Sequence, residues 1–416
     1  MARGWPRSAG HAGLRTGFRH PMYPGDNHGI PVVTLMLQPY RGFANRAEFF
    51  LMGQVFRQPT LGSRWPANSL VRRLCEVVCR SLRRGLCHRE VVAEIRGRSF
   101  RTHTDRLGYF EVHETLPELA DCEGGWQPVR LALADGSCAA EGEVFVPPPA
   151  MRHVVISDID DTIMFTGVLN KAMMMWRLFM QSAESRVAFP GVAELYRAFH
   201  LGPDDNERNA LIYVSRAPWS LYDTLEAFFK LHDIPVGPIL FLREWGLTLQ
   251  HPLPRRAKEH KAMLIRRMLA IYDDMPFVLI GDSGQKDPEI YAELVEEHPG
   301  RVHAVYIRNV GHGPERDRAI ETLAEKVAEA GSTLLLAVDS LAMARHAAEH
   351  GFIAPHHIAR VLDEMAQAEE RPEVHETQQV EAVDADDAAE AAGEENLVQE
   401  GETADASRAD PRPREG

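Results

Sequence analysis

The chain has 416 residues, of which 44% are hydrophobic and 25% charged, and its formal net charge is −14. This length is enough for two domains, and this composition is enough for a sizeable core. Residues 381–416 hold twelve acidic residues and three arginines, so the acidity belongs mostly to the C-terminal end. The sequence shows no clustered basic face of the kind that binds nucleic acid, and no apolar run of the roughly 18 residues that a membrane-spanning helix needs.

The cysteines predict the cellular compartment of the protein, and the composition of its two terminal segments predicts that they are disordered. Five cysteines form neither a disulfide framework nor a Cys-x-x-Cys motif, so a reducing, cytoplasmic location fits best, with peripheral contact at a membrane left open. The Gly and Pro content of the first 25 residues argues against an amphipathic targeting helix, and we expect residues 1–30 to be a disordered leader or to follow from a start codon placed too early. Residues 372–416 have few large apolar side chains, so we expect a disordered acidic tail.

Between residues 31 and 148 the sequence predicts a β-rich accessory domain. Short strand-forming runs alternate with turn formers such as Gly108 and Gly136, which is typical of a small β-sandwich. Leucine and valine at helical spacing interrupt this pattern over residues 70–86. Three prolines at 147–149 form a stiff connector, because proline cannot continue a strand ladder. The predicted strands are Ala47–Val55, Val91–Arg96, Gly108–His113, Val129–Leu133 and Glu141–Val146.

From residue 150 to residue 350 apolar strands alternate with amphipathic helices. This pattern predicts an α/β catalytic domain with a Rossmann-like parallel sheet covered on both faces, followed by a C-terminal helix over 351–371. Ligands in such sheets bind at the carboxyl ends of the strands. The predicted strands are His153–Ser157, Ala210–Ser215, Pro238–Leu242, Phe277–Gly281, Val302–Ile307 and Thr333–Val338. The predicted helices are Val192–Phe199, Trp219–Leu231, Lys261–Ile271, Pro288–Glu296 and Glu315–Glu329.

The first of these strands runs directly into Asp158, Asp160, Asp161 and Thr162. Because side chains alternate along a strand, Asp158 and Asp160 are expected to face one crevice. Two close carboxylates repel each other, and a divalent cation relieves that repulsion; oxygen ligands favour Mg²⁺. The alternative is an acidic turn in which Asp161 or Thr162 caps the segment that follows.

A second buried strand, Phe277–Gly281, also ends in acids. Asp282 follows it directly and could complete a cation site with the first cluster. Asp287 precedes Pro288, a favourable first residue of a helix, so it caps that helix, holds the water shell of the cation, or does both. The predicted ligands of this single Mg²⁺ site are Asp158, Asp160, Asp282 and Asp287.

A third strand ends in Ser215 and Arg216, and two lysines, Lys258 and Lys261, precede the second acidic strand. A hydroxyl at a strand end can hydrogen-bond a phosphate oxygen, and either lysine could neutralise a phosphate or an aspartyl group. Taken singly, a serine after a strand is weak evidence and a lysine on a helix is usually a solvated side chain. The order of all these motifs along the chain is the stronger observation.

That order is Asp-x-Asp-x-Thr after one strand, serine after a second, lysine before a third and Gly-Asp-x-x-x-x-Asp after it, and it resembles the haloacid dehalogenase superfamily of phosphohydrolases. Over roughly residues 150–345 the chain is similar to the catalytic domain of the phosphatidate phosphatases typified by a fungal actin-patch protein. One departure is Arg216, where the string of that family has asparagine, and this departure bears on the substrate. The strings that carry the resemblance are Ser157–Thr162, Ser215–Trp219 and Gly281–Glu289.

The resemblance implies a mechanism. Asp158 would attack phosphorus and form an aspartyl-phosphate, which splits one displacement into two steps. Asp160 would protonate the leaving alkoxide and then accept a proton from water. Mg²⁺, held by Asp158, the backbone carbonyl of Asp160 and Asp282, would neutralise charge on the transferring group. Ser215 and Lys261 would orient the phosphoryl oxygens. The remaining expected substrate contacts are Thr162, Arg216 and Lys258.

The substrate stays open at this point. The run Ala172–Met180 could contact an acyl chain or a membrane, because methionine packs adaptably, or it is a helix buried against the domain. The interval between the first two motifs is too short for a large cap domain, so a site with little or no cap could accept a bulky substrate. We expect a phosphorylated lipid, phosphatidate or a related monoester. The alternatives are a soluble phosphomonoester and a non-catalytic scaffold, against which the complete set of motif residues weighs.

Overall fold

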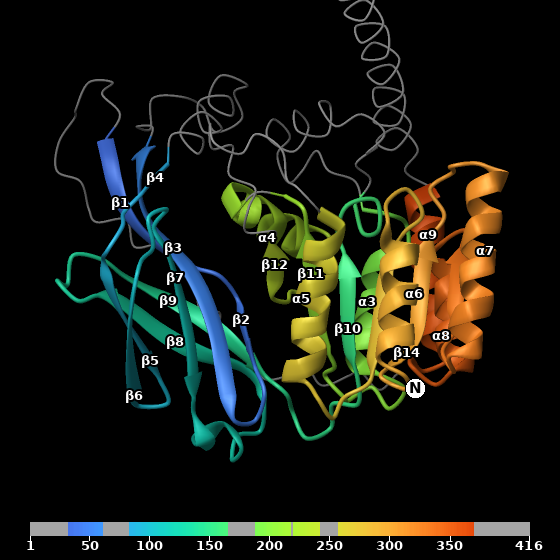
Figure 1. Ribbon diagram of the computed structural model, residues 1–416, viewed down its shortest axis with the longest axis horizontal. Helices are drawn as coiled ribbons and strands as arrows, with labels where there is room; N and C mark the ends of the chain where they lie inside the picture. The colour runs from blue at the N-terminus through green and yellow to red at the C-terminus, as the bar shows by residue number, and fades with distance from the viewer. Residues whose placement is uncertain (1–31, 61–82, 165–187, 218, 242–256, 370–416) are drawn as a thin grey trace, which may run out of the picture.

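The computed structural model describes residues 32–60, 83–164, 188–217, 219–241 and 257–369. Within these ranges a β-rich region lies beside a region of parallel strands and helices, so the chain is a mixed α/β protein (Figure 1). The expected leader, the acidic tail, the run Ala172–Met180 and most of the expected helix over 70–86 lie outside the described residues.

The β-rich region contains β1 (Val32–Pro39), β2 (Gly42–Ala44), β3 (Glu48–Thr60), β4 (Arg84–Gly85), β5 (Glu90–Ile95), β6 (Arg98–His103), β7 (Tyr109–Thr115), the short 3-10 helix η1 (Pro117–Leu119), β8 (Gly125–Leu133) and β9 (Ala139–Val146). They form a nine-stranded sheet in the order β1-β3-β2-β9-β8-β5-β6, with β4 and β7 paired to β3. The predicted strands are confirmed at β3, β5, β7, β8 and β9, whereas the end of the predicted helix is the strand β4. The narrower assignment as a sandwich stays a prediction.

The second sheet consists of β10 (Val154–Asp158), β11 (Ala210–Ser215), β12 (Ile239–Phe241), β13 (Phe277–Asp282), β14 (Val302–Arg308) and β15 (Leu334–Ala337). Its order is β12-β11-β10-β13-β14-β15, and every pair is parallel. All six predicted strands are confirmed. Because β10 lies between β11 and β13, the strand ends that carry the acids and the serine are neighbours at one edge of the sheet.

Helices cover both faces of this sheet (Figure 1). On one face α3 (Val192–Leu201), α4 (Tyr222–Leu231), α8 (Ser340–Glu349) and α9 (His357–Glu369) share a core with alternate strand residues such as Val155 and Ile280. On the other, α5 (Ala257–Ile271), α6 (Asp287–Glu297) and α7 (Pro314–Glu329) pack on the intervening residues, such as Ile156 and Leu279. The predicted covered parallel sheet is confirmed. Among the described residues no helix combines the length and the apolar character needed to span a bilayer.

Buried side chains join the β-rich region to the helices of the second sheet. Tyr40 stacks on Trp219, which lies in the 3-10 helix η3 (Trp219–Leu221) ahead of α4, with ring centroids 4.3 Å apart. The amide of Arg41 donates a hydrogen bond of 2.9 Å to the hydroxyl of Tyr222, and the Arg41 guanidinium pairs with Glu226 at 2.8 Å. The two regions therefore share a packed contact close to the segment that follows β11.

Candidate active site

The first acidic cluster lies at the carboxyl end of β10, whose five residues are all buried. In the parallel register Asp158 is opposite Val214 of β11, so Ser215 lies one residue further along the neighbouring strand. Ile159 is fully buried in the core, while Asp158 and Asp160 on either side of it are buried as well. Carboxylates at such a place need partners or a cation, because burial of an unpaired charge is costly.

The second acidic cluster follows β13 and is organised by its own backbone. The amide of Gln285 donates to Asp282 Oδ1 at 2.9 Å, and the amide of Asp282 donates to Asp287 Oδ2 at 3.4 Å. A side chain at Gly281 would place its Cβ 2.3 Å from Asp287 Oδ2, so only glycine fits there. Lys286, not Asp287, is the N-cap residue of α6, and no side chain caps that helix. The helix-capping alternative for Asp287 is therefore wrong, because its carboxylate turns back toward the strand end.

A buried lysine connects the two clusters. Lys261 of α5 is 1% exposed, and its Nζ lies 2.9 Å from Asp158 Oδ1 and 2.6 Å from Asp287 Oδ1. The ring of Tyr291 lies 5.6 Å from the same ammonium group. Burial alone would lower the pKa of Lys261, but the charges of Asp158 and Asp287 outweigh it and raise this pKa, so the lysine stays charged.

The three acids nearest the lysine fit a divalent cation. Carboxylate oxygens of Asp158, Asp282 and Asp287 all lie within 4.8 Å of one another, and all three side chains are buried. Burial raises the pKa of Asp158 and of Asp282 above the usual range, and the neighbouring carboxylates raise it further. Asp282 Oδ2 is a buried acceptor with no hydrogen-bond partner among the described residues. When all three are ionised, three carboxylates against one ammonium leave two negative charges uncompensated, which matches the charge of Mg²⁺ and its preference for oxygen ligands.

The structure describes the other predicted site residues, Ser215, Arg216, Thr162 and Lys258, in different detail. Ser215 is buried and its Oγ accepts a hydrogen bond of 3.0 Å from the amide of Ala217, which leaves its hydroxyl proton free to be donated. The positive charge of Arg216 acts to lower the pKa of both Asp158 and Lys261, and its Nε is buried without a partner in the described part of the chain. Thr162 is buried. Lys258 belongs to α5, but its side chain lies outside the described residues.

The structure adds two residues to this end of the sheet that the sequence did not indicate, Gln285 and Arg308. Gln285 donates its side-chain amide to Asp158 Oδ2 at 3.3 Å, although it stands inside the second acidic string. Arg308, at the end of β14, donates its Nε to the carbonyl of Thr162 at 2.9 Å and Nη2 to Ser340 Oγ at 3.0 Å. Burial lowers the pKa of Arg308 to about 10. In the sequence, the one sign of Arg308 is that it directly follows the predicted strand Val302–Ile307.

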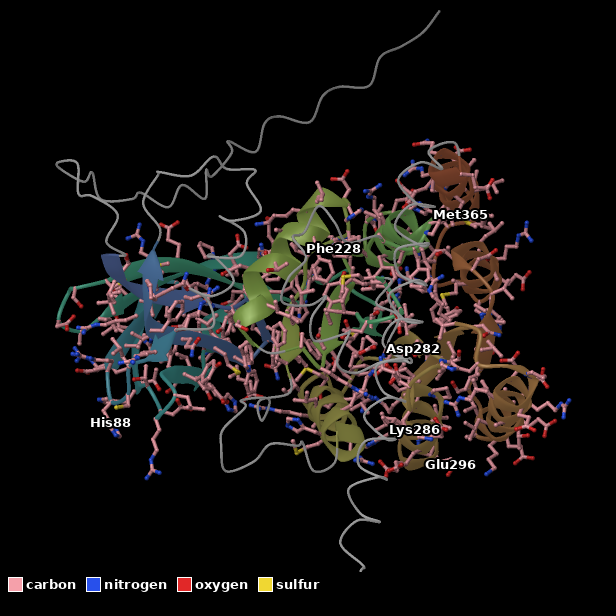
Figure 2. The ribbon with its side chains drawn as sticks, turned by 90° about the horizontal axis from the view of Figure 1, so that it is seen from above. His88, Phe228, Asp282, Lys286, Glu296 and Met365 are labelled. Carbon is pink, nitrogen blue, oxygen red and sulfur yellow. The ribbon has the colours of Figure 1, made fainter. Side chains whose placement is uncertain are left out.

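The edge of the sheet, seen from above in Figure 2, has Asp282 between two layers of helices. Phe228 of α4 and Met365 of α9 lie to one side of Asp282, and Lys286 and Glu296 lie to the other. Fold and site together define a class of protein: a parallel α/β protein with a buried carboxylate–lysine centre at its strand ends, suited to a divalent cation and an anionic substrate group.

Comparison with known proteins points to one family within that class. Residues 153–309 match the family described as "Phosphatidate phosphatase APP1, catalytic domain". The chain is 32% identical over 155 residues to the phosphatidate phosphatase APP1 of Saccharomyces cerevisiae, which covers 37% of this chain and 25% of that protein. It is 27% identical over 225 residues to an uncharacterized protein of Schizosaccharomyces pombe, which covers 53% of this chain and 35% of that protein. The resemblance to the phosphatidate phosphatases is thereby confirmed.

The extent of these matches limits what they show. The chain spans about a quarter and about a third of the length of these two relatives, and the family match contains every acid of the site and Lys261 but not the β-rich region. Among solved structures, a carbohydrate acetylesterase from Xanthomonas citri is 13% identical, with a TM-score of 0.27 over 72% of this chain and 76% of that chain. So weak a likeness carries no argument.

Proposed function

We propose that this protein is a Mg²⁺-dependent phosphatase that hydrolyses a phosphomonoester, phosphatidate or a related lipid phosphate, through an aspartyl-phosphate at Asp158. The observation that carries this proposal is the buried ion pair between Lys261 and Asp158 beside Asp282, at the carboxyl edge of a parallel sheet. A lysine in contact with a carboxylate at this edge places a fixed positive charge where a phosphoryl group would meet the carboxylate. The match to a phosphatidate phosphatase catalytic domain supports the same chemistry.

In the proposed reaction Asp158 is held ready as the nucleophile. One of its oxygens contacts Lys261 and the other accepts from Gln285, so its orientation is fixed before the substrate arrives. As a carboxylate oxygen forms its bond to phosphorus, the bond to the leaving alkoxide breaks, and Asp160 gives that alkoxide a proton. Asp160 then takes a proton from a water molecule that attacks phosphorus, which releases phosphate and restores the Asp158 carboxylate.

We assign the cation to Asp158, Asp282 and the backbone carbonyl of Asp160. When bound, Mg²⁺ supplies neutralisation of the charge that gathers on the transferring group. One oxygen of Asp287 contacts Lys261 and the other accepts a hydrogen bond from the amide of Asp282. We therefore propose that Asp287 holds Lys261 in position and contacts the cation through its water shell. This division gives each buried acid a positive or donating partner.

We further propose that Ser215 donates its free hydroxyl proton to a phosphoryl oxygen and that Arg216 contacts the same group. Thr162 and Lys258 complete the proposed substrate contacts. The lipid is preferred because the relative with a known activity is a phosphatidate phosphatase. A soluble phosphomonoester remains the second candidate, because Arg216 departs from the asparagine of the family string and brings a guanidinium, which can bind phosphate with two hydrogen bonds, to the site.

The organisation of the chain belongs to the same proposal. Residues 150–350 form a haloacid dehalogenase-like, Rossmann-type catalytic domain, and the six parallel strands with the acids at β10 and β13 support that assignment. Residues 31–148 form a β-sandwich accessory domain that packs against η3 and α4. The protein works in the cytoplasm and contacts membranes peripherally when its substrate is a lipid.

Release of inorganic phosphate from purified full-length protein tests this proposal. Mixed micelles of phosphatidate are compared with sugar phosphates and nucleotides, each with Mg²⁺ and with a chelator. We expect release from the micelles that needs Mg²⁺ and disappears in Asp158→Asn. The control is Asp273→Asn, an exposed acid beyond α5, which should match the wild type. Equal release by Asp158→Asn and wild type would overturn the mechanism, and release from soluble esters alone would overturn the lipid assignment.

A further inference from the structure

A second group of side chains that could hold a metal ion lies just beyond the C-terminal end of α3. It consists of Asp205, His356 and His357. Asp205 stands in the loop that follows α3, and the two histidines stand at the beginning of α9. None of the three belongs to the motifs of the phosphatase site, and the fold brings them together from distant parts of the sequence.

The three side chains converge on one point. Asp205 Oδ1 lies 2.6 Å from His357 Nε2, and Asp205 Oδ2 lies 3.2 Å from His356 Nε2. The two imidazole rings have centroids 4.3 Å apart. One ligand atom from each residue lies within 4.8 Å of the other two. Each ring therefore presents the same nitrogen, Nε2, to the same carboxylate.

The backbone, rather than side-chain freedom, sets this arrangement. Asp205 has a φ of 58°, a left-handed conformation that aspartate tolerates better than most residues, and its amide donates to the carbonyl of Gly202 at the end of α3. His357 is fully buried, and its amide donates to the carbonyl of Ala354 at 3.0 Å. His356 and Asp205 are about half exposed, so an ion can reach the group from solvent.

We propose that His356 Nε2, His357 Nε2 and a carboxylate oxygen of Asp205 form a Zn²⁺ site whose fourth position is open to water. Two imidazole nitrogens and one carboxylate oxygen are a ligand set of zinc, which is bound at about 2.0–2.2 Å in tetrahedral geometry. Tetrahedral ligands at that range are about 3.3–3.6 Å apart. The 3.2 Å between His356 Nε2 and Asp205 Oδ2 is close to this range, whereas His357 Nε2 lies 2.6 Å from the other oxygen, Oδ1, and has to give up that contact on binding.

The site differs in chemistry from the carboxylate centre of the proposed phosphatase. Mg²⁺ prefers oxygen ligands, whereas imidazole suits zinc and its neighbours among the transition metals. The two cations are therefore expected to prefer different sites.

Zn²⁺ bound there would give α9 contacts at both ends of α3. At the other end of α3 the carboxylate of Glu364, from α9, accepts hydrogen bonds from the amides of Ala193 and Glu194, at 3.4 and 2.8 Å. The zinc site lies just beyond the last turn of α3, and Glu364 lies at its first turn. A cation at Asp205 would complete a two-point attachment, so its expected effect is on the stability of this helix pair.

Zinc binding by the metal-stripped full-length chain tests the proposal. Titration calorimetry with Zn²⁺, in excess Mg²⁺, is compared between wild type and the variants Asp205→Asn and His356→Asn, which change half-exposed side chains. We expect the wild type to bind one Zn²⁺ that each variant binds more than about a hundredfold more weakly, since even the partners of metal ligands contribute about 10–100-fold. The thermal midpoint of the wild type should rise with Zn²⁺, and that of the variants should rise less.

The matched control is His350→Asn. His350 stacks on His346 with ring centroids 3.9 Å apart, and no hydrogen bond or ion pair described for these two rings involves a carboxylate, so this variant should bind Zn²⁺ as the wild type does. Circular dichroism confirms that each variant is folded. Equal zinc affinity and stoichiometry in wild type, Asp205→Asn and His356→Asn would overturn the proposal. Asp205 and the two histidines would then serve only to hydrogen-bond α9 to the loop after α3.

Discussion

Tyr40 stacks on Trp219, and this contact ties the β-rich region to the segment that follows Ser215. The ring centroids are 4.3 Å apart, and both rings are buried. The hydroxyl of Tyr40 and Nε1 of Trp219 have no hydrogen-bond partner within the described residues. The contact therefore acts through apolar packing and ring stacking, which together stabilise the neighbourhood of a proposed phosphate ligand.

Replacement of Tyr40 separates its ring from its hydroxyl. Tyr40→Ala removes a buried aromatic ring and should lower the free energy of unfolding by about 3–5 kcal/mol. Tyr40→Phe keeps the stack and removes a buried polar atom without a partner, so it should be neutral or stabilising. Urea unfolding measures both. A loss of stability in the phenylalanine variant as large as that in the alanine variant would show that the hydroxyl, not the ring, matters.

Lys261 should be strongly coupled to its two carboxylates. Lys261→Met leaves Asp158 and Asp287 buried without their cation, which is expected to cost about 3–5 kcal/mol and to abolish phosphate release. Asp287→Asn added to Lys261→Met removes one of the stranded charges and should recover part of that loss. A double-mutant cycle of urea unfolding gives the coupling energy. Strictly additive losses would contradict a shared buried ion pair.

The parallel sheet and the position of its chemistry could be predicted because both depend on local patterns. Apolar strands that alternate with amphipathic helices gave all six strands, and the rule that ligands bind at strand ends placed Asp158, Ser215 and Asp282 at one edge. In the β-rich region β1, β2 and β6 were not predicted. The side chains of β6 are mostly exposed and polar and lack the apolar alternation of a half-buried strand.

Contacts between distant segments could not be predicted. The carbonyl of Thr162 is bonded to Arg308 on β14, and nothing in the local sequence of either residue indicates the other. The role of Asp287 was ambiguous for the same reason. A proline after an aspartate suggests a capped helix, whereas the buried ammonium of Lys261, from another helix, draws the carboxylate toward itself.

His153 should make the fold sensitive to acid. Burial, aided by the charge of His303, lowers the pKa of His153 to about 4, so the folded protein binds this proton less readily than the unfolded chain does. The stability that the neutral His153 contributes is fully present above the ordinary histidine pKa of about 6.5. It is lost as the pH falls toward 4, and the free energy of unfolding drops by about 3 kcal/mol. His153→Leu should reduce this loss between pH 7 and pH 4.5 in urea unfolding. His303→Gln, which changes an exposed ring, should retain most of it.

Asp282 should weaken the metal-free fold as the pH rises. Burial, and then the charges of Asp287 and Asp158, raise the pKa of Asp282, so the folded protein holds a proton that the unfolded chain releases. Stability without divalent cations should therefore decline from about pH 4 upward through the raised pKa. Asp282→Asn removes this ionisation and should flatten the decline, although it removes a proposed Mg²⁺ ligand and should abolish phosphate release.

Added Mg²⁺ should restore the wild type at high pH, because a bound cation favours the charged carboxylates, and it should leave Asp282→Asn nearly unchanged. Thermal unfolding from pH 5 to pH 9, with and without Mg²⁺, measures both effects, and Asp273→Asn should keep the slope of the wild type. If Mg²⁺ stabilised Asp282→Asn as much as the wild type, the cation would have to bind elsewhere, and Asp282 would lose its assigned place in the site.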